Sequence, residues 1–161
     1  MTMDKPFGSL DGAPIVTKFA ITETEKLAEI IERYKLNNRP VPEYCIEGIK
    51  QLASLLQQSQ PDYNLELSLK PGLDPEEIVN NNLEIAWYLS AWLYFYNRLA
   101  KFSDEDALFL IDVPFFVDEI LIYLLRAESV KSMTKPNMLR RRDPVTFPAF
   151  VASCNASKRD P

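Results

Sequence analysis

Two stretches in the first third of the chain carry apolar residues at the spacing of an amphipathic helix. The first follows Thr22 and Glu25, which fit a capping box, and it predicts a helix from Thr22 to about Tyr34. The second starts at Pro42, whose missing backbone donor suits a first helical turn, and it predicts a helix that ends at Gln58. The apolar side of this second helix would bury Cys45, Ile46, Ile49, Leu52, Ala53 and Leu56.

A different pattern, the alternation of apolar and polar residues, occurs in two short segments. Residues 64–70 alternate throughout and predict a strand, and residues 15–21 show the same period of two. The apolar positions are Leu65, Leu67 and Leu69 in one segment and Ile15, Phe19 and Ile21 in the other. Paired together, the two segments would form a small two-stranded β-ribbon.

The second half of the chain predicts three more helices and then a tail. Asp74 and Pro75, followed by two acids, are a strong helix start, and this helix would reach Lys101, either unbroken or interrupted at the three asparagines 80–82. Residues 103–111 predict a short helix, and residues 115–128 predict another. After Ser129, the prolines at 136, 144 and 148 favour an extended chain.

These elements predict a mainly α, single-domain helical bundle of four to six helices, with or without the short two-stranded β-ribbon, and an extended C-terminal tail. We expect an acidic helical domain over residues 1–128, with 1–14 flexible, and a basic tail over 129–161. Charge separates the same two parts, because the tail has seven basic and two acidic residues whereas the rest has eleven and twenty-one. With 161 residues, the chain can bury one core without disulfides.

The most informative segment is the aromatic run from Trp87 to Tyr96. Its predicted helix has aromatic residues on its outer face as well as its inner face, and a helix that is apolar all round must be covered on every side. We therefore expect part of this surface to meet a partner, and we assign the apolar anchor to Tyr88, Trp92 and Phe95. The alternative is that these residues form the core.

The last predicted helix has a similar surplus of apolar side chains. The stripe that holds its charged residues Asp118, Glu119 and Arg126 also carries Phe115 and Ile122. One domain of this size can cover one all-apolar helix completely, and covering two is harder. The remaining apolar surface would then be available to a partner or a ligand.

The tail supplies the second candidate binding element. Arg140, Arg141 and Arg142 precede a segment of spaced aromatics and prolines, as in peptides that dock in extended form. Two alternatives stay open, because the tail could pack against its own domain through Phe147, Phe150 and Val151, or its arginines could contact anionic lipid heads. The acidic body does not suit nucleic acid.

Composition excludes several kinds of catalysis. The chain has no histidine, which removes imidazole acid–base chemistry and the commonest metal ligand, and its four glycines are too scattered for a phosphate-binding loop. Carboxylates are the only abundant catalytic residue type. Asp112, Asp118 and Glu119 interrupt the apolar stretch 108–125 and make it a poor membrane span. We expect these three to cap a helix and form its wet edge, and we predict neither cofactor nor metal.

The cysteines and the first residues bear on the compartment. Cys45 and Cys154 lie far apart in the sequence, which is not the pattern of a disulfide scaffold. The amino terminus lacks the apolar core of a signal peptide. We expect a cytoplasmic protein.

Taken together, these patterns favour a non-enzymatic protein–protein interaction module, as an adaptor, assembly factor or regulator, whose partner could also be a second copy in a homodimer. The alternative hypothesis is a helical carrier of a lipophilic small molecule or pigment held among the aromatic residues. An enzyme is the third hypothesis, and it would need a carboxylate or tyrosine site that sequence spacing does not reveal.

Overall fold

A computed structural model describes residues 13–99, 112–133 and 146–156. These residues form five helices: α1 (Ile15–Leu36), α2 (Glu43–Gln58), α3 (Pro75–Leu99), α4 (Val113–Ser132) and α5 (Thr146–Ala156). The described part of the chain contains no strand. The mainly α fold class is therefore confirmed.

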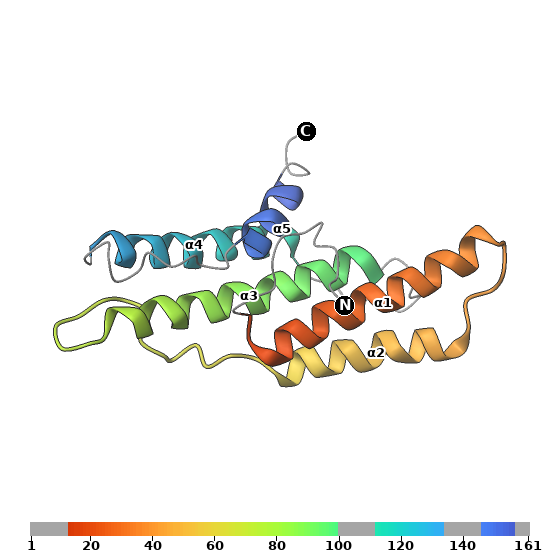
Figure 1. Ribbon diagram of the computed structural model, residues 1–161, viewed down its shortest axis with the longest axis horizontal. Helices are drawn as coiled ribbons and strands as arrows, with labels where there is room; N and C mark the ends of the chain where they lie inside the picture. Colours follow the sequence, from red (N-terminus) through yellow and green to blue (C-terminus); the bar gives the residue numbers. More distant parts are fainter. Residues whose placement is uncertain (1–12, 100–111, 134–145, 157–161) are drawn as a thin grey trace, which may run out of the picture.

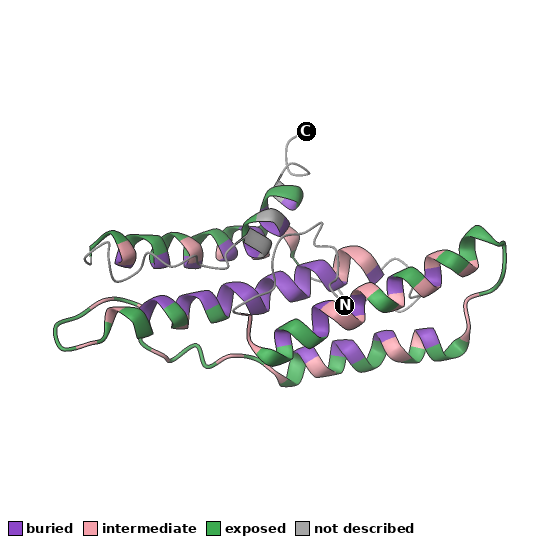
Figure 2. Ribbon diagram, in the orientation of Figure 1, coloured by how far each residue is buried: buried purple, intermediate pink, exposed green. Residues whose placement is uncertain are grey.

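The long helix α3 lies at the centre of the arrangement (Figure 1). The antiparallel hairpin of α1 and α2 packs on one side of it, and α4 packs on the other. The short helix α5 contacts both α3 and α4 and crosses them steeply near the start of α4. This sandwich of helices covers α3 from several directions, and almost every residue of α3 from Ile78 to Phe95 is buried (Figure 2).

The predicted starts of α2, α3 and α4 are confirmed. Pro42 lies immediately before α2, and the Asp74 carboxylate accepts a hydrogen bond from the backbone N–H of Glu76 at 3.1 Å at the start of α3. The Asp112 carboxylate caps α4 by accepting from the N–H of Phe115 at 3.2 Å. Each start has a proline and an acid nearby, so the local sequence is enough to define it.

The expected β-ribbon is wrong for both of its segments. Residues 15–21 form the first turns of α1, and Thr22 lies inside that helix, where its hydroxyl donates to the Lys18 carbonyl at 2.8 Å. Residues 64–70 contain turns but no strand. The leucines of this segment are nevertheless half-buried, and the polar residues between them are exposed. The alternation of apolar and polar residues therefore reflects a loop that lies along the surface of the core.

The three asparagines do not break α3, and two of them fasten this loop to it. The Asn81 side-chain amide donates to the Glu66 carbonyl at 2.9 Å. Asn82 is buried, and its amide donates to the carbonyls of Leu67 and Ile78 at 3.0 and 2.8 Å. The helix therefore continues without interruption from Pro75 to Leu99.

The chain after Ser129 is only partly as expected. Helix α4 continues to Ser132, and residues 146–156 form α5, so the prediction of an extended tail is wrong for those residues. Val151 of α5 is buried, and buried Asn155 accepts from the Asn97 side chain of α3 at 2.9 Å. The predicted helix at 103–111 lies outside the described residues.

Candidate functional site

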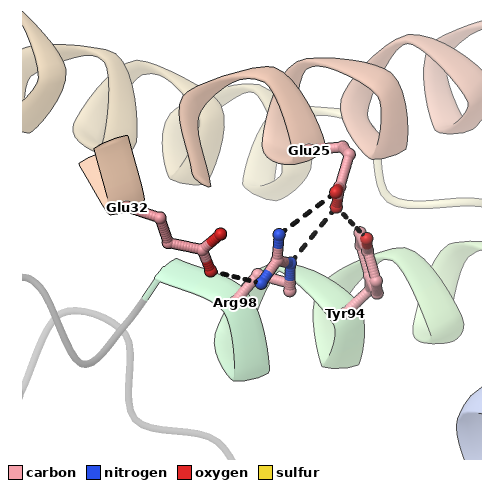
Figure 3. Close-up of polar contacts among 4 residues, drawn as sticks. All are labelled: Glu25, Glu32, Tyr94 and Arg98. Carbon is pink, nitrogen blue, oxygen red and sulfur yellow. Dashed lines mark hydrogen bonds and ion pairs between the residues drawn. The ribbon is translucent and has the colours of Figure 1, made fainter. Parts of the chain in front are cut away.

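A cluster of four polar residues joins α1 to α3 (Figure 3). The Arg98 guanidinium donates two hydrogen bonds to Glu25, from Nε at 3.2 Å and from Nη2 at 3.1 Å, and a third from Nη1 to Glu32 at 2.8 Å. The Tyr94 hydroxyl donates to the same Glu25 carboxylate. The two acids lie two turns apart on α1 and the other two residues lie one turn apart on α3, so both helices present matching faces.

The electrostatics of this polar cluster favour a fixed contact. The exposed fractions of the Arg98, Glu25 and Glu32 side chains are 25%, 22% and 44%. The hydrogen bonds from Arg98 to Glu25 and Glu32 outweigh its partial burial and raise the pKa of Arg98. Burial raises the pKa of Tyr94, and its hydrogen bond to Glu25 raises it further. Because two carboxylates already share the guanidinium, the geometry fits a clamp between helices better than a site for an incoming anion.

The three residues predicted as an apolar anchor lie in the core. Tyr88, Trp92 and Phe95 are only 5%, 8% and 0% exposed. An anchor formed by these side chains at the surface is therefore wrong for this fold, because α1, α4 and α5 pack against α3 and the Tyr88 hydroxyl bonds to α2.

These aromatic residues have a structural task instead. The Tyr88 hydroxyl donates to the Leu56 carbonyl in the last turn of α2 at 2.7 Å and accepts from the Trp92 indole N–H at 2.9 Å. Trp92 meets Phe95 edge to face, with ring centroids 5.8 Å apart. The polar atoms of Tyr88 and Trp92 thus satisfy each other and the end of a neighbouring helix, which lets both side chains be buried.

The other predicted site residues fall into two groups. Arg140, Arg141 and Arg142 lie outside the described residues. Asp112 caps α4, Asp118 is exposed and Glu119 is partly exposed, so these acids lie at the surface of α4 as expected. Neither cysteine of the chain is in a disulfide; Cys45 is buried and Cys154 is exposed.

The outer face of α4 carries a group of exposed apolar residues. Phe115, Leu121, Ile122 and Leu125 are 53%, 40%, 40% and 67% exposed, and we call these four residues the α4 outer stripe. In Figure 2 the side of α4 that faces α3 is buried and the opposite side is exposed. The sequence contained part of this signal, because Phe115 and Ile122 share a face with the charged residues of α4, but Leu121 and Leu125 were not singled out.

A cavity of about 340 Å³ lies between the start of α1, the segment after α2 and the middle of α3. Its lining includes Pro14, Ile15, Val16, Pro61, Glu84 and Tyr88. Of the three predicted aromatic residues, only Tyr88 lines it. The cavity is near the lower limit of the volumes that hold small ligands, which run from roughly 300 to 1,000 Å³.

Two structural findings and the comparisons with known proteins bear on the site. Among the described residues, no group of three or more acidic or cysteine side chains could hold a metal ion, and no described helix is long and apolar enough to cross a membrane. Searches against protein-family models, curated proteins and solved structures found no match to the chain.

Proposed function

We propose that this protein is a protein–protein interaction module whose docking surface is the α4 outer stripe. The observation that carries the proposal is the exposure of Phe115, Leu121, Ile122 and Leu125 on one face of one helix. Exposed apolar residues scattered singly are ordinary, but a contiguous group on a helix is typical of an interaction surface. Burying this group in a complex would release about 25 cal/mol for each Å² of apolar area removed from water.

The surroundings of the stripe support a protein partner of a particular kind. Arg126 is exposed and Glu119 partly exposed at the edge of the stripe, and Asp118 is exposed within it. An apolar centre with charged residues at its edge is the usual anatomy of a protein interface. The partner that fits it is an apolar helix face that carries both charge signs, because such a face matches the stripe in shape and in charge.

Native mass spectrometry of the protein purified at low salt from its own host tests this proposal. We expect the wild type to carry the mass of a bound protein chain and the double variant Ile122→Ser/Leu125→Ser to lose it. Tyr44→Ser is the matched control, because Tyr44 is 60% exposed on α2, away from the stripe. Binding that survives in the double variant, or that is lost equally in the control, would contradict the proposal.

The basic segment at Arg140, Arg141 and Arg142 is a second contact within the same proposal. It would add charge to a complex that the stripe holds by apolar contact, and such exposed charges act mainly on the association rate. Raising the salt concentration should therefore slow association of the wild type and have less effect on a variant with alanine at all three positions. Equal salt dependence in both would remove the tail from the proposal.

A carrier of a lipophilic small molecule is the second candidate function, favoured by the cavity that Tyr88 lines. The same native mass spectra distinguish the two. A carrier would hold extra mass far below that of a protein chain, and Val16→Trp, which places a large ring in the cavity lining, would remove that mass while leaving the stripe intact.

A further inference from the structure

We propose that the partner of the α4 outer stripe is the same stripe on a second copy of this chain, with the two α4 helices packed antiparallel. This inference rests on the proposed function, since it names the occupant of that docking surface. Three features of α4 support it: the spacing of the outward residues, the distribution of charge along them and the size of the face.

The outward residues of α4 follow the spacing of a helix that pairs with another helix. They recur at alternate steps of three and four residues and so form a seam along the helix. The seam consists of Phe115, Asp118, Ile122, Leu125 and Ser129. All five are exposed, whereas the opposite face of α4 packs inward. The buried residues of that inward face are Val117, Ile120, Tyr123, Ala127 and Val130.

Charge along the seam selects the antiparallel direction. In a parallel pair in register, Asp118 would meet Asp118 of the second copy in the seam, and two like charges would repel. In an antiparallel pair with Ile122 beside Leu125 of the second copy, Asp118 instead lies beside the second copy's Ser129 hydroxyl. The antiparallel arrangement therefore removes the one unfavourable contact of the seam.

The residues that flank the seam add a favourable contact in the same arrangement. Glu119 and Arg126 are one heptad apart on the same flank. In the antiparallel pair each Glu119 lies opposite Arg126 of the second copy, and the two-fold axis repeats this ion pair. The Arg126 guanidinium is 5.3 Å from the centroid of the Tyr123 ring, which holds its charge at the edge of this face.

The size of the face predicts a weak and reversible dimer. Helix α4 has 20 residues, so it is about 30 Å long and about 10 Å wide. A single helix–helix contact of this size falls well below the roughly 800 Å² per partner of standard stable interfaces. We therefore expect a dimer that forms at micromolar or higher concentration and that closes as a two-fold pair without further growth.

Sedimentation equilibrium over a concentration series tests the dimer and its direction with four variants of the full chain. Leu125→Glu should weaken association at least about tenfold, and so should Glu119→Arg or Arg126→Glu alone, because each reversal turns both ion pairs into repulsions. The double variant Glu119→Arg/Arg126→Glu should restore association, since the pairs are re-formed with opposite sign. Gln57→Glu on α2 is the control for added charge, and circular dichroism checks that each variant is folded.

The outcomes separate this inference from the proposed function. A monomer at every concentration, or a dimer that Leu125→Glu leaves intact, overturns self-association. Failure of the double variant to restore a dimer that both single variants weaken overturns the antiparallel arrangement. If the chain is monomeric but binds a different protein through the stripe in native mass spectra, the proposed function stands and only the second copy is wrong.

Discussion

At the scale of single residues, the contact between α1 and α3 depends on Arg98. Removing its guanidinium in Arg98→Met leaves two partly buried carboxylates on α1 without the donor they share. We expect a loss of about 2 kcal/mol in the free energy of unfolding, in the range for hydrogen bonds to charged groups. Urea unfolding measures it.

The matched control for that variant is Arg33→Met, which removes an exposed arginine from the same helix that carries Glu25. A surface change of this kind should stay within about 0.5 kcal/mol. Equal effects of the two substitutions would show that the polar cluster adds nothing to stability. Arg98→Lys should recover only part of the loss, because an ammonium cannot make the forked contact to Glu25.

The tyrosines predict how stability changes at alkaline pH. Burial raises the pKa of Tyr63 to about 12, and burial also raises the pKa of Tyr88 and of Tyr94 above the ordinary value near 10. Between about pH 10 and pH 12 the unfolded chain therefore loses these protons while the folded chain keeps them. Stability should be complete below pH 10 and should fall as the pH rises through this window.

Urea midpoints measured from pH 8 to pH 11.5 check this expectation. Tyr63→Phe removes one of the ionising groups, so its midpoint should fall less steeply with pH than that of the wild type. Identical slopes in the two proteins would mean that Tyr63 ionises equally in the folded and unfolded states. The comparison at pH 8 controls for the loss of the hydroxyl itself.

At the scale of the elements, Gly48 sets how closely α2 approaches α1. A Cβ atom at this position would lie 3.1 and 3.2 Å from the two terminal carbons of Leu27. Leu27 is only half-buried, so its flexible end can move by a few tenths of an ångström. Gly48→Ala should therefore be tolerated or stabilise by up to about 1 kcal/mol through helix propensity, whereas Gly48→Leu should cost roughly 1–3 kcal/mol by forcing the helices apart.

Gly72 gives the contrasting case. Nothing lies within 4 Å of a Cβ placed there, but its φ of +89° is a conformation that other residues adopt with strain. Gly72→Ala should therefore cost about 1 kcal/mol despite the open space. Thermal unfolding that ranked Gly48→Ala as the more harmful of the two alanine variants would contradict both arguments.

Sequence patterns predicted helix starts best where a proline and an acid lie nearby, as at α2, α3 and α4. Helix α1 shows why they failed elsewhere. Its buried face is made largely of small or polar residues at helical spacing, so a count of large apolar residues misses it. Exposed Ile15 and Phe19 meanwhile gave residues 15–21 the alternation of a strand, and Pro14 starts the helix without a side-chain cap.

The polar cluster of Glu25, Glu32, Tyr94 and Arg98 could not be predicted from the sequence, because its members are far apart along the chain. Glu25 was assigned to a capping box, which is a local contact, but its partners Tyr94 and Arg98 are 69 and 73 residues away. Only the packing of α1 on α3 brings these groups together. The same packing buries the aromatic run, so the alternative that these residues form the core is confirmed and the prediction of a surface anchor is wrong.

At the scale of the whole molecule, helix α3 is covered almost completely, whereas helix α4 is covered on one face only. Helices α1, α4 and α5 pack against α3, and α2 contacts it through the hydrogen bond from Tyr88 to Leu56. Helix α4 lies at the outside with its inner face on α3 and its outer face exposed (Figure 2). The sequence indicated that one domain of this size can cover one such helix completely and that covering two is harder. The structure buries α3 and leaves exposed apolar residues on the outer face of α4, as well as at the start of α1.

Site-specific photo-cross-linking in living cells is the most direct test of α4 as the binding surface. A photoreactive phenylalanine at position 115 lies on the α4 outer stripe, and the same group at position 44 replaces an equally exposed aromatic residue on α2. We expect a covalent adduct to a protein chain from position 115 that Leu125→Glu abolishes, and none from position 44. Adducts of equal yield from both positions, or none from position 115, would contradict the assignment of α4 as the binding surface.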